Sequence, residues 1–319
     1  MKVLLVGCGA VGLSLASALY TSDVETDLIA RGETAEAIRK NGIERHGILG
    51  QAAIGPGKIR IFDTIDNAAG GYDFIIISAK ATANTDIAES LSNRKDDILS
   101  ADGCIVLYQN GYGNEQAFTK IFEPGQIYHA SFAIGFKRPV PYISEVTVIT
   151  APISIGSIFG CRAEACKKLA EAIDQGGIPC KLTNEIDKTL WAKLLYNCTL
   201  NPLSAILGTN YGGLLKSESS ISLVEGIISE VFAVMQASGH ETFWQDAAAY
   251  KKDFFEKILP PTYGHRASTL QDIERKIPTE IDSLNGAIVK MGQRLNVDTP
   301  RNKVITQIIK SIEALYHVN

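Results

Sequence analysis

One apolar segment of the chain carries three polar side chains at regular spacing. In residues 190–203, which read LWAKLLYNCTLNPL, each of Lys193, Asn197 and Asn201 lies four positions from the next. Residues four apart share one face of a helix, so these side chains are predicted to form a line along it. A charge on so apolar a helix needs a partner or a cleft, because isolated burial is costly. A narrow solvent-facing stripe on a packed helix explains the pattern equally well.

A lysine in this setting is suited to the reduction of a carbonyl group. Negative charge grows on the carbonyl oxygen as hydride reaches the carbon, and a nearby cation stabilises that charge and then donates a proton. Partial burial would lower the lysine pKa towards neutrality and make the donation easier. The asparagines can hold a substrate hydroxyl or carboxylate without adding charge. Pro202 is expected to kink or loosen the helix near Asn201.

Residues 7–12, with the sequence GCGAVG, match the pattern G-x-G-x-x-G. The motif follows the apolar run Val3–Val6 and precedes a helical pattern, which is the context that dinucleotide binding requires. Its glycines permit a tight turn and a close approach of backbone to pyrophosphate at the helix N-terminus. The alternative is a glycine-lined turn that only packs a helix on a strand. The residues expected to contact a dinucleotide are Gly7, Cys8, Gly9, Ala10, Val11 and Gly12.

The end of the second predicted strand bears on the type of dinucleotide. NAD enzymes place an acidic residue there to bind the ribose 2′-hydroxyl. In this chain Ala30 occupies that position and Arg31 follows it. The missing carboxylate and the planar guanidinium both favour a 2′-phosphate, so the pattern predicts NADP(H). Asp27, early in the strand, and Glu33, in the following loop, are the weaker grounds for NAD(H).

Four other polar residues are candidates on less specific grounds. Lys80 and Asn110 each follow a predicted strand, and ligands of α/β sheets bind outside the carboxyl ends of such strands. A solvated loop lysine and an ordinary Asn-Gly turn explain them as well. Glu280 borders the apolar face of a predicted helix, where an acid in the first turn also complements the dipole. Ser268 fits the start of a helix equally well, and the pattern alone selects neither Glu280 nor Ser268.

The predicted elements that position these residues fall into two halves. Short apolar runs predict strands at 3–6, 27–30, 59–62, 74–78 and 105–108, with helices between them at 10–20, 34–41, 84–91 and 116–121. Strands at 127–136, 146–150, 153–158 and 178–182 and a helix at 162–175 complete this half. Helices alone follow, at 185–207, 219–238, 244–258, 267–273, 278–293 and 300–316. We therefore expect an α/β fold, with a Rossmann-type parallel sheet in residues 1–184 and an all-α domain in residues 185–319.

Composition narrows the class of protein without indicating its chemistry. The chain has 319 residues and a formal net charge of -4, which argues against nucleic acid or an anionic membrane as its main partner. The apolar run at 3–6 is too short for a signal peptide, and no stretch approaches the roughly 18 apolar residues of a membrane span. Six cysteines without a CxxC pair indicate buried, reduced thiols. We expect a cytoplasmic protein without a metal site, in which the apolar helices after residue 219 allow a homodimer.

Taken together, these segments resemble the 2-dehydropantoate 2-reductases, or ketopantoate reductases. The resemblance runs in order along almost the whole chain and is carried by the glycine motif, Arg31, Ser78-Ala79-Lys80, Gln109-Asn110-Gly111, the segment 190–203, Ser268-x2-Gln271-Asp272, Thr279-Glu280-Ile281-Asp282-x2-Asn285-Gly286 and Pro300-x-Asn302. The C-terminal motifs are far more specific than the glycine motif.

The resemblance implies an NADPH-dependent reduction of 2-dehydropantoate to (R)-pantoate, a step towards pantothenate and coenzyme A. It implies that Lys193 is the general acid and contacts the substrate. Glu280 assists at the junction of substrate and cofactor. The remaining implied contacts are Arg31 and Lys80 to the cofactor, Asn110 to both ligands, and Asn197, Asn201 and Ser268 to the substrate. The site is expected between the two domains.

Two departures from the family pattern bear on the substrate. Asn210 is displaced by one residue from the place of a further substrate asparagine, with Tyr211 and Gly212 beside it. The segment Phe132–Glu145, which contains Pro139 and Pro141, is longer than expected. Reduction of a different 2-oxo acid on the same scaffold therefore stays open. A nucleotide-binding sensor without catalysis is a third alternative, although a sensor has no need for a charge on an apolar helix.

Overall fold

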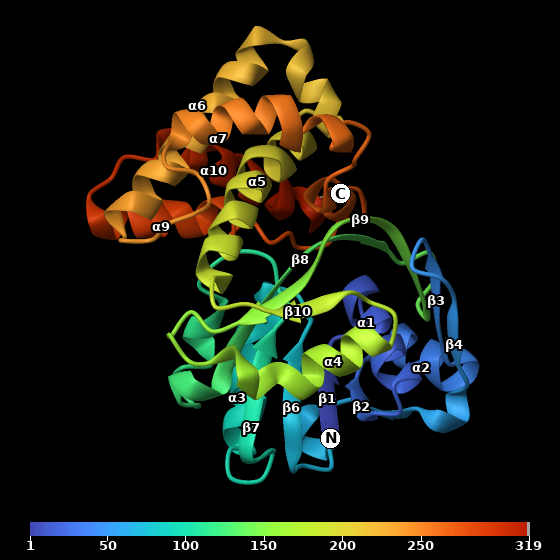
Figure 1. The fold of residues 1–319 in the computed structure, drawn as a ribbon. Coiled ribbons are helices and arrows are strands. Elements are labelled where there is room, and N and C mark those ends of the chain that lie inside the picture. The colour runs from blue at the N-terminus through green and yellow to red at the C-terminus, as the bar shows by residue number, and fades with distance from the viewer. Residues whose placement is uncertain (318–319) are drawn as a thin grey trace. The chain divides into compact units, whose positions relative to one another are not determined.

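The computed structural model describes residues 1–317 (Figure 1). Two compact units compose it. The first consists of Met1–Gln109 and Asn114–Ile186, and the second consists of Asn110–Gly113 with the chain from Asp187 onward. The division therefore falls after residue 186, compared with the expected boundary at 184. It also assigns the short segment 110–113 to the second unit, which is the half that carries Lys193.

The first unit is built on one ten-stranded sheet. Six neighbouring strands are parallel and lie in the order β5–β2–β1–β6–β7–β8, with β5 at one edge of the sheet. Their bounds are β1 Lys2–Val6, β2 Glu25–Ile29, β5 Arg60–Phe62, β6 Tyr72–Ile77, β7 Leu99–Leu107 and β8 Ile127–Lys137. Because the chain builds outward from β1 first through β2 and later through β6, the strand order reverses at β1. Such a switch point is where doubly wound sheets bind nucleotides.

The rest of the sheet adds antiparallel pairs to the predicted parallel sheet. Strand β9 (Ile143–Gly156) runs antiparallel to β8, and the two strands predicted at 146–150 and 153–158 are both part of it. Strands β3 (Ile43–Gly47) and β4 (Ala52–Ile54) form an antiparallel pair that the sequence reading missed. The sequence of β3, IERHG, is too polar to read as a buried strand, and it is held by parallel pairing with β9. Strand β10 (Cys180–Leu182) pairs in parallel with β9.

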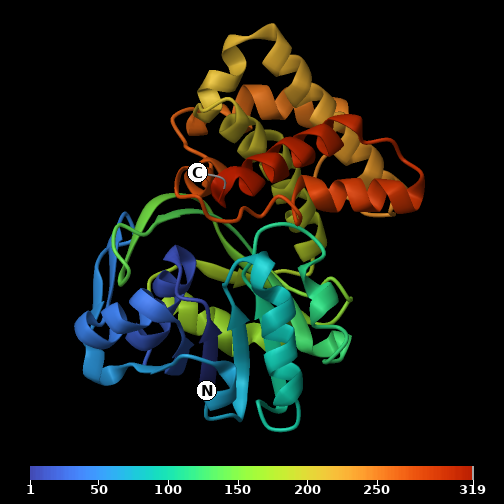
Figure 2. The ribbon, with the colours of Figure 1, turned by 180° about the vertical axis from the view of Figure 1, so that it is seen from behind.

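Alternate residues of the strands enter two cores on opposite faces of the sheet. Val3 and Leu5 of β1 pack in one core with α1 (Ala10–Thr21), α2 (Gly32–Asn41) and α4 (Lys167–Gln175). Leu4 and Val6 pack in the other core with α3 (Asn84–Asn93). Figure 1 shows α1 and α4 in front of the sheet, and Figure 2 shows α3 covering it from behind. Because side chains alternate along a strand, a sheet covered on both faces requires continuous apolar strands.

The second unit is helical, as the sequence predicted. Its helices are α5 Ile186–Ile206, α6 Glu218–Ala237, α7 Ala247–Asp253, α8 Ser268–Glu274, α9 Asn285–Leu295 and α10 Pro300–Ala314. They share one hydrophobic core, in which Trp191 of α5 is fully buried. Within the described residues, α6 is the one helix long and apolar enough to cross a membrane, although the sequence reading found no such stretch. More than half of its apolar window is buried inside the unit, as in the core helix of a globular fold.

Three predicted helices differ most from the observed ones, and the helix predicted at 162–175 begins as a 3-10 turn at Ala163–Cys166. The stretch 116–121 is largely irregular, with a 3-10 turn at Asn114–Ala117. The helix predicted at 244–258 is shorter, since α7 passes into a π-helical turn at Phe254–Ile258. The helix predicted from residue 278 begins only at Asn285, after a turn in which Ser283 and Leu284 donate their amides to the Glu280 carbonyl. The apolar spacing was misleading there, because Ile281 and Leu284 reach the core from a turn.

Helix α5 continues through Pro202, and a distant side chain compensates for the missing N–H. A proline cannot donate to the carbonyl four residues before it, here that of Cys198. The Asn285 side chain donates to this oxygen at 3.0 Å and to Oδ1 of Asn302 at 2.9 Å. Asn302 in turn donates to Glu230 at 2.8 Å. Residues of the Asn285-Gly286 and Pro300-x-Asn302 motifs therefore stabilise the helix that carries Lys193.

Candidate functional site

The glycine loop after β1 has the geometry that a dinucleotide requires. Gly7 has a φ of +103°, and a Cβ there would lie 2.5 Å from the Ala79 amide nitrogen. A Cβ on Gly12 would lie 1.9 Å from the Gly7 carbonyl oxygen. A Cβ on Gly9, in contrast, would meet no atom within 4 Å among the described residues other than its chain neighbours. The outer glycines are therefore needed for packing, and Gly9 leaves open space at the start of α1, where a pyrophosphate would lie.

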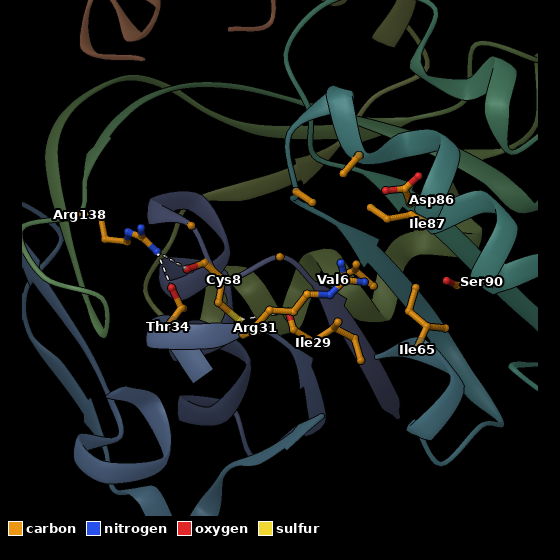
Figure 3. Close-up of a pocket in the computed structure, with 15 residues that line it drawn as sticks. Val6, Cys8, Ile29, Arg31, Thr34, Ile65, Asp86, Ile87, Ser90 and Arg138 are labelled. Atoms are coloured by element: carbon orange, nitrogen blue, oxygen red, sulfur yellow. Dashed lines mark hydrogen bonds between the residues drawn. The ribbon is translucent and has the colours of Figure 1, made fainter. Parts of the chain in front are cut away.

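A cavity of about 280 Å³ adjoins this loop (Figure 3). Its lining includes Gly7, Cys8 and Gly9 of the loop and Ala30 and Arg31 after β2. Asp86 and Ser90 of α3 line the opposite side in Figure 3 from Arg138, which follows β8. Burial raises the pKa of the Cys8 thiol to about 12, partly offset by the charge of Arg138. A thiol that stays neutral near pH 7 does not act as a nucleophile, so Cys8 serves as a lining residue.

The surroundings of β2 show which of the candidate residues could bind the ribose of a dinucleotide. Asp27 is fully buried, accepts a 2.6 Å bond from Arg60 Nε and a 2.6 Å bond from the Tyr72 hydroxyl, and does not line the cavity. Glu33 is exposed in the first turn of α2 and is also outside the lining. Arg31 lines the cavity, and its Nε donates to the Asp63 carbonyl at 3.2 Å. A cationic donor, and neither of the two acids, therefore faces the space after β2.

Side-chain amides join the ends of β6 and β7 next to the glycine loop. Gln109, directly after the β7 region, donates from Nε2 to the Ala79 carbonyl at 2.7 Å and to Oδ1 of Asn84 at 2.6 Å. Ser78 donates to the Gly7 carbonyl at 2.7 Å. Lys80 follows this connected segment and precedes a 3-10 turn at Ala81–Ala83. The carboxyl ends of β1, β6 and β7 are thus fixed to one another by buried and partly buried side-chain hydrogen bonds.

In the second unit, Lys193 lies on α5 with its ammonium nitrogen shielded from solvent. Burial lowers the pKa of Lys193 to about 7, and the negative charge of Glu280 opposes that shift. A lysine with such a pKa exists in both protonation states near neutral pH, which is the property that a general acid requires. Two residues earlier, the side chain of Trp191 packs against Tyr112, with 4.9 Å between the ring centroids, and anchors this part of the helix.

The segment 110–113 carries Asn110 to Glu280. The Asn110 side chain donates to Oε2 of Glu280 at 3.1 Å. The next residue approaches the same turn closely: a Cβ on Gly111, whose φ is +92°, would lie 2.3 Å from the Ser283 carbonyl oxygen. Tyr112 donates its amide to that oxygen at 2.8 Å. Asn110, Glu280 and, through its charge, Lys193 therefore belong to one polar group within the second unit.

The two asparagines of the α5 stripe are buried, with exposures of 8% for Asn197 and 5% for Asn201. The Tyr211 hydroxyl, which is also buried, donates to Oδ1 of Asn201. Asn210 instead caps the 3-10 helix Tyr211–Lys216 by accepting from the Gly213 amide at 3.0 Å. Tyr211, and not the neighbouring Asn210, is thus the residue of this segment whose side chain binds Asn201. Asn210 has a local structural role.

Ser268 is the first residue of α8, and its side chain is exposed. This placement agrees with the helix-start interpretation, and no hydrogen bond found among the described residues joins Ser268 to the polar group around Lys193. Among the described residues 1–317, no three His, Cys, Asp or Glu side chains cluster closely enough to hold a metal ion. The polar group around Lys193 therefore combines an ammonium group, a carboxylate and side-chain amides.

Three contacts of these two units were missed by sequence reasoning. Arg138 reaches the cavity of the first unit from the β8–β9 hairpin. Tyr211 binds Asn201. In the second unit, the Tyr112 hydroxyl lies 3.2 Å from both Asp187 and His240, whose Nδ1 lies 2.7 Å from Asp187. The arginine and the tyrosine at 211 had a signal in the sequence, since both lie in segments that depart from the family pattern.

Known proteins of one family are similar to this chain over almost its whole length. The family model described as "Ketopantoate reductase PanE/ApbA" matches residues 3–159, and the model of its C-terminal part matches residues 185–313. The 2-dehydropantoate 2-reductase of Aquifex aeolicus is 34% identical over 317 residues, which are 98% of this chain and 97% of that protein. A crystal structure of the 2-dehydropantoate 2-reductase of Geobacter metallireducens is 25% identical with a TM-score of 0.85, covering 98% of this chain and 99% of that one.

A structure of a D-mandelate dehydrogenase with NADH and anilino(oxo)acetate has the same fold. Its TM-score is 0.85 at 24% identity, and the match covers 99% of both chains. At this identity the likeness concerns the fold alone. The same architecture therefore also occurs in a protein whose name refers to a different hydroxy acid.

Proposed function

Because the chain belongs to the ketopantoate reductase PanE/ApbA family, we propose that it reduces 2-dehydropantoate to (R)-pantoate with NADPH and uses Lys193 as proton donor. The protein is an oxidoreductase that acts on the CH–OH group of a donor, and its substrate is a small keto acid. The observation that carries the finer proposal is the shielded Lys193 ammonium group, with its pKa near 7, beside Glu280 and Asn110.

The residues of the first unit fit a dinucleotide. Gly9 leaves open space at the start of α1, and Arg31 lines the adjoining cavity where Asp27 and Glu33 do not. A guanidinium group without a neighbouring ribose carboxylate favours a 2′-phosphate over a 2′-hydroxyl. Lys80 follows the segment bound to the glycine loop and adds a further positive charge on this side. A bound reduced nicotinamide would supply the hydride for the carbonyl carbon.

The residues of the second unit fit the other half of the reaction. Lys193 in its protonated form stabilises the developing oxyanion and donates a proton to it. Glu280 keeps a fraction of Lys193 protonated at neutral pH, because its charge opposes the effect of burial. Asn197 and Asn201 are buried amides on the same helix, suited to a hydroxyl or carboxylate of the substrate. Asn110 is oriented by Glu280. The remaining proposed substrate contact is Ser268, at the start of α8.

A second candidate is the reduction of a different 2-oxo acid. The observation that favours it is Tyr211, a buried aromatic residue bound to Asn201 after the position where the family often has an asparagine. Because a D-mandelate dehydrogenase shares this fold, branched and aromatic 2-oxo acids belong among the alternatives to be tested. The family assignment, in contrast, disfavours a sensor without catalysis. For either substrate, we expect the protein to act in the cytoplasm.

The test is the loss of NADPH absorbance when the purified protein receives 2-dehydropantoate. We expect kcat/KM for 2-dehydropantoate to exceed that for a panel of branched and aromatic 2-oxo acids, and NADPH to be preferred to NADH. A higher kcat/KM with another acid of the panel would replace the substrate and leave the reaction class in place. No oxidation of either dinucleotide with any of the acids would contradict the proposal as a whole.

A further inference from the structure

The hairpin between β8 and β9 brings a second arginine to the cavity of the first unit. Arg138 directly follows β8, and its Nη1 donates to the Cys8 carbonyl at 3.3 Å and to Oγ1 of Thr34 at 3.1 Å (Figure 3). Thr34 and Arg138 are 104 positions apart in the sequence. Cys8 lies in the glycine loop and Thr34 in the first turn of α2, so Arg138 bridges the two segments that enclose this side of the cavity.

The cavity carries uncompensated positive charge. Neither Arg31 nor Arg138 forms an ion pair with any carboxylate of residues 1–317, since Arg31 donates to the Asp63 carbonyl and the Asp63 carboxylate binds Arg39. Asp86 is the one acidic residue among those that line the cavity in the described chain. Two guanidinium groups face one carboxylate, and such a balance in a confined space attracts an anionic ligand.

Arg138 retains donors for that ligand. A guanidinium group presents five N–H groups in a planar fork. Both hydrogen bonds of Arg138 to the described residues start from Nη1, which leaves the N–H groups of Nε and Nη2 without an acceptor in this part of the chain. The Cys8 carbonyl and Thr34 hydroxyl hold one edge of the fork in place. The remaining edge has the geometry that binds two phosphate oxygens.

The position of Thr34 indicates which phosphate this would be. Rossmann folds hold the ribose 2′ substituent at the loop after the second strand, and Arg31 and Thr34 belong to that loop and the helix it opens. The pyrophosphate is expected at the start of α1 against backbone N–H groups, whereas Arg138 contacts the glycine loop through a carbonyl oxygen. A phosphate monoester carries a charge of about −1.5 to −2 at pH 7, which two guanidinium groups would balance.

We propose that Arg138 binds the adenosine 2′-phosphate of NADP(H) together with Arg31, and that the β8–β9 hairpin is a determinant of cofactor preference. This inference rests on the proposed use of a dinucleotide, and it assigns a role to the part of Phe132–Glu145 that departs from the family pattern. Among the described residues that line the cavity, Arg138 is the one that follows α3 in the sequence.

Binding of adenosine 2′,5′-bisphosphate and of 5′-AMP to the full-length protein, measured by titration calorimetry, separates the 2′-phosphate from the rest of the ligand. We expect Arg138→Gln to weaken binding of the bisphosphate by roughly 10- to 100-fold, the loss of hydrogen bonds to a charged group, and to leave 5′-AMP binding unchanged. Arg138→Lys should retain part of the affinity, because it keeps the charge but loses the fork. Lys137→Gln, which removes the neighbouring exposed charge outside the cavity, is the matched control.

The outcomes distinguish this inference from the proposed function. A wild-type protein that binds both nucleotides equally would overturn the preference for NADP(H), and the role of Arg138 with it. A wild-type preference that Arg138→Gln retains in full would overturn only the role of Arg138. Equal losses for both nucleotides would show that Arg138 serves the hairpin or the pyrophosphate instead. If the glutamine variant does not fold by circular dichroism, the same ratios measured on Arg138→Lys decide the question.

Discussion

The Asn110 side chain donates a hydrogen bond to Oε2 of Glu280 at 3.1 Å, although 170 positions separate the two residues. The bond joins the segment after β7 to the turn before α9, and the backbone bond from Tyr112 to Ser283 reinforces it. Glu280 also raises the proton affinity of Lys193. One carboxylate therefore orients an amide and adjusts an ammonium group, and the predictions for the second unit depend on this double role.

Lys193→Ala should reduce turnover by about 10²- to 10⁴-fold, the usual contribution of a general acid. Binding of NADPH, followed by fluorescence titration, should stay unchanged, because Lys193 is not among the residues proposed to bind the dinucleotide. Lys290→Ala, which removes an exposed lysine on α9, is the control and should keep full turnover. Wild-type turnover in the Lys193 variant would contradict its role as proton donor.

The pH dependence of kcat/KM should report the titration of Lys193. Its pKa lies near 7, and the protonated form is the one that donates, so kcat/KM should fall as the pH rises through about 7. The decline should approach tenfold per pH unit at higher pH. The measurement is a pH series with substrate well below KM. A profile that is flat up to pH 9 would exclude a donor with this pKa.

Glu280→Gln should move the decline of that profile to lower pH. The substitution removes the negative charge that opposes the effect of burial, so the pKa of Lys193 should fall further. A glutamine oxygen can still accept from Asn110, which preserves the local hydrogen bond. Asp282→Asn, which changes an exposed carboxylate two residues away that pairs with Lys310, should leave the profile in place. A profile shifted to higher pH would reverse the assigned direction.

Arg31→Asp should change the cofactor preference from NADPH towards NADH. An aspartate would repel a 2′-phosphate and can accept from a ribose 2′-hydroxyl, so KM for NADPH should rise by roughly 10- to 100-fold. The measurement is the ratio of kcat/KM values for the two dinucleotides. Arg39→Gln removes a cation of α2 that pairs with Asp63 outside the cavity, and it should leave the ratio unchanged. An unchanged ratio in the Arg31 variant would contradict the proposal that Arg31, after β2, favours NADPH.

Tyr211→Phe should weaken binding of the keto acid without changing binding of the dinucleotide. Its hydroxyl holds Oδ1 of Asn201 and thereby directs the amide nitrogen of that side chain. Loss of one buried hydrogen bond corresponds to about 1 kcal/mol, or roughly a fivefold rise in KM for the oxo acid. Tyr263→Phe, at an exposed position, is the control. Equal changes in KM for both substrates would indicate a general loss of packing instead.

Local patterns predicted much of the fold for a physical reason. The strands of the first unit lie between two cores, so their apolar runs are continuous and readable. The turn at 280–284 was misread, because Ile281 and Leu284 reach a core at helical spacing without forming a helix. The β3–β4 hairpin was missed, because its polar sequence depends on pairing with β9, about 100 positions further along.

The sequence by itself determined which side chains share a helix face and where the glycine loop must lie. Both follow from patterns within a few residues. The pitch of a helix places Lys193, Asn197 and Asn201 in one line. The glycine loop needs Gly7 and Gly12 because neighbouring backbone leaves no room for a Cβ at either position. The tertiary structure alone decided which partners these groups have. Asp27 is satisfied by Arg60 and Tyr72, and Arg138 reaches Thr34, through contacts that packing creates between distant segments and that no local period encodes.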